Sequence, residues 1–145
     1  VDYASGAVEE MVLKYKNSEY LIIEGQGSLL NPGSTATLPL MRGSRPTALV
    51  LCHRLGLRVV ESETKILIPP LEQVINLNEQ LVTGLNSFPT ANVKAVALDT
   101  RVYDHASAIN EISKMEDKLN LPVTDPVRFS AKKIANALIY NKWLL

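Results

Sequence analysis

A carboxylate and a glycine-rich loop follow one of the most apolar stretches of this sequence. Glu24 comes directly after Tyr20–Ile23, and the next residues are Gly25, Gln26, Gly27 and Ser28. A carboxylate at the end of a strand can bind Mg²⁺, which prefers oxygen ligands. Backbone N–H groups in a glycine-rich loop can point at an anion. The loop therefore predicts a metal or anion site with Glu24 as metal ligand, although a turn with a capping glutamate has the same composition.

Polar residues also follow the other apolar stretches that we expect to form strands. The stretch 48–52 is followed by His53 and Arg54, and 93–98 is followed by Asp99, Thr100 and Arg101. The stretch 121–123 is followed by Thr124 and Asp125, with Arg128 three residues later. In an open parallel sheet, ligands bind beyond the carboxyl ends of the strands. These side chains are therefore candidates for one common site.

Each candidate also has a structural interpretation. His53 is a general base, a phosphate ligand or an acyl-transfer catalyst, or else a histidine held by a hydrogen bond at a strand end. Asp99 and Thr100 contact a ligand or cap the next helix. Asp125 and Arg128 belong to the site, or are a helix cap and a surface arginine. The residue types alone leave these alternatives open.

The segments that would position these residues alternate between the apolar patterns of helices and those of strands. Apolar residues follow a helical spacing in four segments, which are 8–15, 71–85, 108–119 and 134–139. Nearly continuous apolar runs, typical of strands covered on both faces, occupy 20–23, 48–52 and 93–98, with a last short strand at 121–123. This order predicts one α/β domain with a mainly parallel sheet and helices on both faces.

Composition excludes several classes of protein. The 145 residues carry 15 basic and 15 acidic side chains, so neither a dedicated nucleic-acid binder nor a membrane-surface binder is expected. No apolar run approaches the roughly 20 residues of a membrane-spanning helix. Cys52 is the single cysteine, which excludes an internal disulfide and favours a cytoplasmic location. We expect Cys52 to be buried, on the opposite face of its strand from His53.

Six segments resemble a known family. They are "GAVE" (6–9), "IEGQGSLLNPG" (23–33), "RPTALVLCH" (45–53), "IPPLEQVI" (68–75), "ALDT" (97–100) and "LPVTDPVRF" (121–129). Together they resemble the carboxyl-terminal P-loop domain of the D-glutamate N-acetyltransferase-like family, formerly a domain of unknown function, over nearly all of residues 1–145. More distantly, "IEGQGSLLNP" is similar to a loop of dethiobiotin synthetase, an enzyme that uses ATP and Mg²⁺.

The resemblance implies a P-loop NTPase-like fold and, in characterised relatives, acetyl transfer from acetyl-CoA to the amino group of D-glutamate. It places an acid at Glu24 and a strand-end histidine at His53, which we predict to be catalytic, with Glu24 also binding metal. The residues predicted to contact the cofactor are Gly25, Gln26, Gly27, Ser28, Asp99, Thr100, Asp125 and Arg128. Asparagine is more usual in the family where this chain has Asp99. The cofactor is acetyl-CoA or ATP with Mg²⁺, and the substrate is a small molecule.

The phosphate-binding motif GxxxxGK[ST] does not occur in the sequence. The resemblance implies that this loop, its strand and a Rossmann-like domain lie upstream of Val1. We therefore expect a carboxyl-terminal fragment or a split subunit, with an incomplete sheet that pairs with the upstream part or with another copy. Three functions remain open: an acetyltransferase, an ATP- and Mg²⁺-dependent enzyme, and a non-catalytic binding module. We expect the isolated chain to be inactive.

Overall fold

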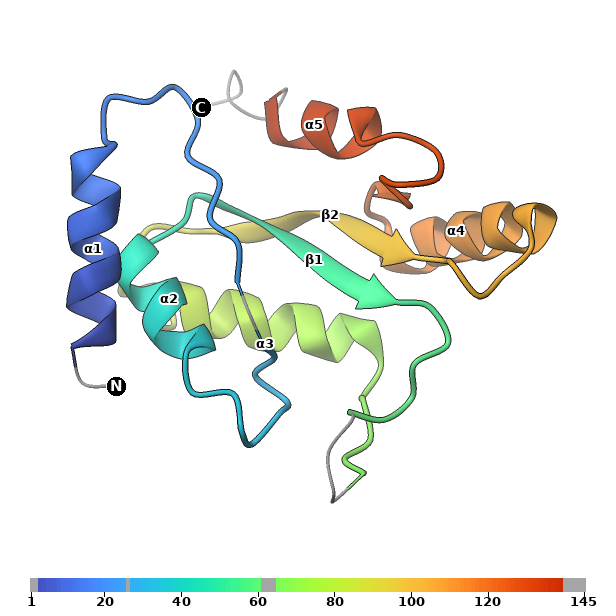
Figure 1. Cartoon of the computed structure of the whole chain (residues 1–145), viewed down its shortest axis with the longest axis horizontal. Helices are drawn as coiled ribbons and strands as arrows, with labels where there is room; N and C mark the ends of the chain where they lie inside the picture. The colour runs from blue at the N-terminus through green and yellow to red at the C-terminus, as the bar shows by residue number, and fades with distance from the viewer. Residues whose placement is uncertain (1–2, 26, 61–64, 140–145) are drawn as a thin grey trace. The chain divides into compact units, whose positions relative to one another are not determined.

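The computed structural model describes residues 3–25, 27–60 and 65–139, in which strands and helices alternate after two initial helices (Figure 1). The elements are α1 (Ala4–Lys14), α2 (Thr37–Ser44), β1 (Ala48–Arg54), α3 (Leu71–Thr83), β2 (Asn92–Asp99), α4 (His105–Leu119), β3 (Val123–Thr124) and α5 (Lys132–Ile139). They form two compact units. One contains residues up to 47 and 58–91, and the other contains 48–57 and the residues from 92 onward.

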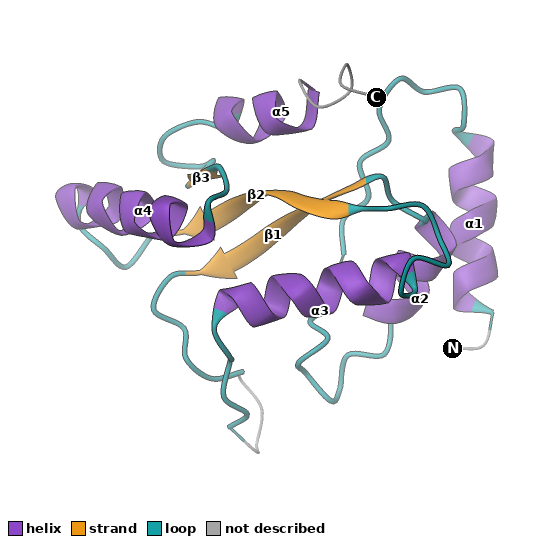
Figure 2. Ribbon diagram, turned by 180° about the vertical axis from the view of Figure 1, so that it is seen from behind, coloured by secondary structure: helices purple, strands orange, loops and turns teal. Residues whose placement is uncertain are grey.

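The second unit is built on a parallel sheet with β2 between β1 and β3 (Figures 1 and 2). This arrangement confirms the predicted α/β class. The pairing of β1 with β2 is irregular at one point, because Leu49 lies opposite Val93 whereas Val50 lies opposite Ala95. Lys94 is therefore an extra residue on β2, and the alternation of faces changes there.

The core of this unit lies between β2, β3 and α4. Its buried cluster consists of Val96, Leu98, Ile112 and Val123. Burying an aliphatic side chain of this size contributes about 1.5–3 kcal/mol, so the cluster fixes the strands and α4 together. At the start of α4, Asp104 accepts hydrogen bonds from the amide of Ser107 (2.9 Å) and from its hydroxyl (2.6 Å). This cap sets where the loop after β2 ends.

In the first unit, α1 packs against α2 at Gly43. A Cβ atom on Gly43 would collide with the Ser5 carbonyl and the Val8 side chain, so a larger residue would separate the two helices. The sequence pattern did not predict α2, since Pro39 and Gly43 both have low helix propensity. Packing against α1 outweighs that propensity.

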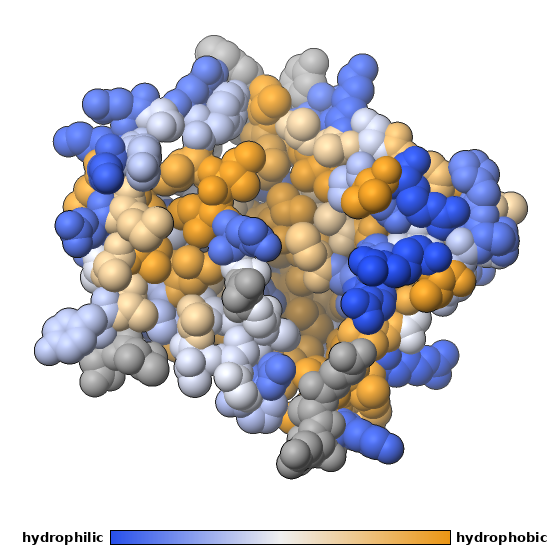
Figure 3. Space-filling view, in the orientation of Figure 1, coloured by the Kyte–Doolittle hydropathy of each residue, from blue (hydrophilic) through white to orange (hydrophobic). Residues whose placement is uncertain are grey.

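One predicted strand is wrong. Residues Tyr20–Ile23 have no assigned secondary structure, and Ile22 is 91% exposed. A strand requires a neighbouring strand for its backbone hydrogen bonds, and this segment is not part of the described sheet. Apolar surface, orange in Figure 3, accordingly appears on the left of the view, where Figure 1 draws α1 and the extended segment after it.

None of the described helices is long and apolar enough to cross a membrane.

Candidate functional site at the carboxyl edge of the sheet

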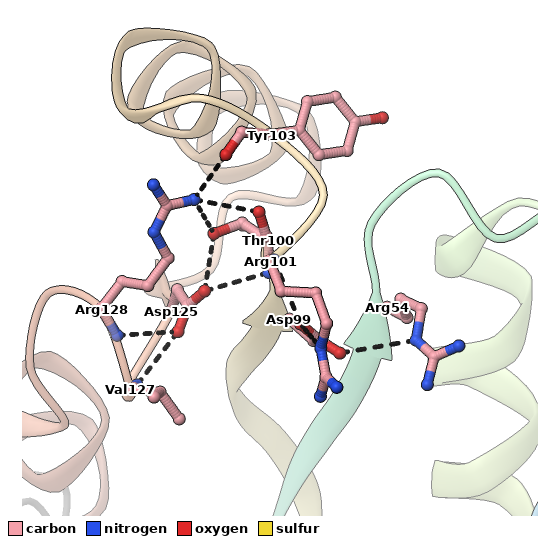
Figure 4. A network of polar contacts seen from close by, with 8 residues as sticks. All are labelled: Arg54, Asp99, Thr100, Arg101, Tyr103, Asp125, Val127 and Arg128. Carbon is pink, nitrogen blue, oxygen red and sulfur yellow. Dashed lines mark hydrogen bonds and ion pairs between the residues drawn. The ribbon is translucent and has the colours of Figure 1, made fainter.

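The buried carboxylate of Asp125 organises the loops that follow β2 and β3. Asp125 is 2% exposed, and its Oδ2 accepts hydrogen bonds from the amide (3.0 Å) and the hydroxyl (2.6 Å) of Thr100. Its Oδ1 accepts hydrogen bonds from the amides of Val127 (3.0 Å) and Arg128 (3.1 Å). Figure 4 shows these contacts. Four donors therefore hold one carboxylate, which orients the two loops with respect to each other.

The side chain of Arg128 also forms hydrogen bonds with this cluster. Its Nη1 donates to the carbonyl (3.0 Å) and the hydroxyl (3.2 Å) of Thr100, and to the carbonyl of Tyr103 (2.9 Å) (Figure 4). We call Thr100, Asp125 and Arg128 the loop network. The network joins residues that lie 25 or 28 positions apart in the sequence, and the fully buried Thr100 is its centre.

Asp99 ends β2 between two arginines. Nε of Arg101 lies 2.9 Å from Oδ1 of Asp99, and Nε of Arg54 lies 3.4 Å from Oδ2. The hydrogen bond from the Arg101 side chain is the main reason why the pKa of Asp99 lies below its ordinary value. Asp99 is thus ionised at neutral pH and joins the end of β1 to the end of β2.

His53 lies opposite Leu98 near the end of β1 and is half-buried. Leu51, two residues earlier on the strand, packs against the core cluster. Because side chains two residues apart lie on the same face of a strand, His53 lies on this face too. Burial lowers the pKa of His53, so its imidazole is neutral at pH 7. Cys52 lies on the other face as predicted, but it is exposed rather than buried, because β1 has only β2 as neighbour among the described strands.

The structure decides several of the capping alternatives. Neither Asp99 nor Thr100 caps α4, since Asp104 does so. Asp125 caps the turn formed by residues 126–129, and α5 begins only at Lys132. His53, Asp99, Thr100, Asp125 and Arg128 thus all belong to one edge of one sheet. Arg54 and Arg101, which also follow strand ends in the sequence, extend this edge through their contacts with Asp99.

The low pKa of Asp125 predicts acid sensitivity. Burial by itself raises this pKa, but the hydrogen bonds from Thr100, Arg128 and Val127 outweigh burial and lower it. The ionised form therefore stabilises the folded state fully above the unfolded pKa of about 3.9, and this contribution is lost as the pH falls through the lower folded value. Urea unfolding at several pH values should show the stability difference between wild type and Asp125→Asn shrinking below pH ~4. A stability difference that does not change with pH would contradict a lowered pKa of Asp125 in the folded protein.

The predicted acidic loop lies in the first unit. Glu24 is exposed and lines an open, mainly apolar depression with Ala4, Val8, Ala36, Pro39 and Leu40. Beyond Gly27, the chain makes successive tight turns, in which Ser28 accepts from the Leu30 amide (3.1 Å) and Asn31 from the Gly33 amide (2.9 Å). Gln26 lies outside the described residues. The loop therefore leads from Glu24 to the start of α2.

Gly27 has a backbone that only glycine adopts easily, with φ of 86°, and a Cβ atom there would collide with the Ser34 hydroxyl. We expect Gly27→Ala to lower the free energy of unfolding by about 1–3 kcal/mol, because the new side chain strains this turn. Gly33→Ala is the matched control, since its Cβ would meet only Asn31 Oδ1 at 3.4 Å. Urea unfolding of both variants measures the difference, and equal stabilities would show that the turn at Gly27 relaxes freely.

The described residues contain no group of three or more His, Cys, Asp or Glu side chains that could hold a metal ion. Glu24 makes no ion pair or hydrogen bond with another described residue, so its oxygens are accessible. A Mg²⁺ ion at Glu24 would therefore take its remaining ligands from water and from phosphate groups, as Mg²⁺ commonly does.

Comparison with known proteins places these loops in a family. Residues 1–135 match the family described as "Domain of unknown function (DUF1611_C) P-loop domain". This chain belongs to that family. As a DUF1611_C P-loop domain, it is similar to the crystal structure of a DUF1611 family protein from Anabaena variabilis, with 48% identity and a TM-score of 0.94 over 97% of this chain and 41% of that one.

Two curated relatives of the DUF1611_C domain are named D-glutamate N-acetyltransferase. The protein from Tritonibacter scottomollicae is 26% identical over 94% of this chain, and that from Pseudoalteromonas sp. is 30% identical over 88%. The matches cover 41% and 38% of those two proteins. The chain therefore spans about two fifths of the length of the curated relatives that it matches.

Proposed function

We propose that this chain is part of an N-acetyltransferase that transfers the acetyl group of acetyl-CoA to the amino group of D-glutamate. The observation that carries the proposal is the match to two relatives from different organisms, both named for this activity, over 94% and 88% of the chain. Membership of a P-loop domain family supports it, because coenzyme A presents phosphate groups that such a domain can bind.

The chemistry requires a proton acceptor, because the amino group of D-glutamate is protonated at neutral pH and must lose a proton before it attacks the thioester. His53 suits this role, since burial lowers its pKa and leaves the imidazole unprotonated at pH 7. The nitrogen of D-glutamate forms the new C–N bond, the C–S bond of acetyl-CoA breaks, and the thiolate leaves. Glu24 is the alternative base, because its carboxylate is exposed.

The test uses the complete protein that contains this chain. Purified protein is incubated with acetyl-CoA and D-glutamate, and the products are measured as released thiol and, by mass spectrometry, as N-acetyl-D-glutamate. L-Glutamate serves as the stereochemical control. We expect both products in equal amounts with the D isomer. Thiol release without N-acetyl-D-glutamate would indicate hydrolysis and reject the acceptor, and no thiol release would reject the transferase.

The P-loop family description favours one further candidate, an ATP- and Mg²⁺-dependent enzyme. In that case Glu24 would hold Mg²⁺ beside the phosphates of ATP. ADP formation that requires both Mg²⁺ and a second substrate, in the absence of acetyl-CoA, would favour this candidate over the acetyltransferase.

A further inference from the structure

Arg128 has an unusual environment for an exposed arginine. All three acceptors of its Nη1 are uncharged, namely the carbonyl and hydroxyl oxygens of Thr100 and the carbonyl of Tyr103. The nearby carboxylate of Asp125 accepts four hydrogen bonds, one of them from the main-chain amide of Arg128 and none from its guanidinium group. Within the part of the chain that the structure describes, Arg128 forms no ion pair with a carboxylate. The guanidinium group is therefore held in place by uncharged acceptors, without a direct ion pair to a described carboxylate.

The rest of the guanidinium group faces away from the loop network. Figure 4 shows Nη1 directed toward Thr100 and Tyr103, whereas Nε and Nη2 point to the opposite side. The ring of Phe129, whose centroid lies 5.6 Å from Cζ of Arg128, restricts the group further. An arginine edge with two parallel N–H groups matches the two oxygens of a carboxylate or a phosphate. Because Nη1 is already anchored, binding there would cost little side-chain entropy.

We propose that the Nε–Nη2 edge of Arg128 is a preformed binding group for an oxoanion of the substrate or cofactor. Its position supports this role, since Arg128 follows β3 at the carboxyl edge of the sheet, where α/β proteins bind ligands. The oxoanion is either a phosphate of coenzyme A or a carboxylate of D-glutamate. The choice of these two ligands rests on the proposed function, whereas oxoanion binding itself does not.

The variant Arg128→Lys separates anchoring from binding. A lysine ammonium has three N–H donors, which can serve the three acceptors of Nη1, but it has no second edge for an oxoanion. Arg45→Lys is the matched control, because Arg45 precedes β1 at the amino end of the strand and pairs with Glu9 at 3.4 Å. Calorimetry on the complete protein then measures the binding of coenzyme A, D-glutamate and inorganic phosphate.

We expect Arg128→Lys to weaken binding by about tenfold or more, with an unfolding temperature close to that of wild type. Weaker binding of coenzyme A and phosphate would identify a phosphate as the ligand, and weaker binding of D-glutamate alone would identify a carboxylate. Unchanged affinity for all three ligands would overturn the proposal, even if the protein proves to be an active acetyltransferase. Conversely, oxoanion binding that depends on Arg128 would stand even if no acetyl transfer were found.

A second measurement needs no variant. Phenylglyoxal modifies accessible arginines, and mass spectrometry of peptides reports the modification of Arg128 separately from that of Arg45. We expect coenzyme A, D-glutamate or phosphate to protect Arg128 but not Arg45. Equal modification of Arg128 with and without each ligand would overturn the proposal in the wild-type protein.

Discussion

Replacing Asp125 with alanine should lower the free energy of unfolding by about 3 kcal/mol or more, because a buried donor left without its acceptor costs about 1–3 kcal/mol. Four donors lose their acceptor at once in this variant. The Thr100 hydroxyl is the most affected, since Thr100 is fully buried and its bond to Asp125 is short, at 2.6 Å. Urea unfolding followed by circular dichroism measures the loss.

Two variants sharpen this experiment. Asp117→Asn is the control, because Asp117 is an exposed residue of α4 and such changes usually alter stability by less than about 0.5 kcal/mol. Asp125→Asn keeps one acceptor oxygen and should fall between wild type and Asp125→Ala. Asp125→Ala as stable as Asp117→Asn would mean that water replaces the carboxylate, and that the loop network does not hold the two loops together.

Replacing His53 with asparagine should reduce kcat for acetyl transfer by about 100- to 10,000-fold, the usual contribution of a general base. Asparagine has similar polarity but cannot accept a proton at neutral pH, so the proton of the attacking amine has no acceptor. Steady-state kinetics of the complete protein with acetyl-CoA and D-glutamate measures the effect. The fall should appear in kcat and in kcat/KM together, because the interaction is made in the transition state.

Cys52→Ser is the control for this variant, since Cys52 precedes His53 on β1 but faces the other side of the strand. We expect it to retain kcat within about threefold, because a change outside the reacting groups leaves the barrier nearly the same. If His53→Asn also retains kcat, the base is a different residue, and Glu24 becomes the first alternative to test by Glu24→Gln.

Much of the fold could be predicted from the sequence, because the long elements carry repeated signals. The helices at Leu71–Thr83 and His105–Leu119 have apolar residues at helical spacing over several turns, and β2 is apolar from Val93 to Leu98 except for Lys94. The failures come from tertiary contacts. Residues Tyr20–Ile23 have the composition of a strand but do not join the described sheet, and α2 forms despite Pro39 because it packs against α1.

The sequence predicts which residues lie at the candidate site, but not which of them form hydrogen bonds with one another. The strand-end rule placed Asp99, Thr100, Asp125 and Arg128 at the same edge of the sheet. It could not show that Asp125 bonds Thr100 rather than capping α5, because residues 25 positions apart meet only through the register of β2 with β3. Whether these residues also bind a cofactor remains a prediction.

The loop network also has a consequence for the order of folding. Thr100 and Asp125, which are 25 positions apart, meet only when the segment between them, which contains α4, has closed and β3 has paired with β2. We therefore expect these hydrogen bonds to form late, after the sheet and α4 are in place. Removing them should leave the rate of folding almost unchanged and act instead on the rate of unfolding. The network thus governs how long the folded carboxyl edge persists rather than how quickly it forms.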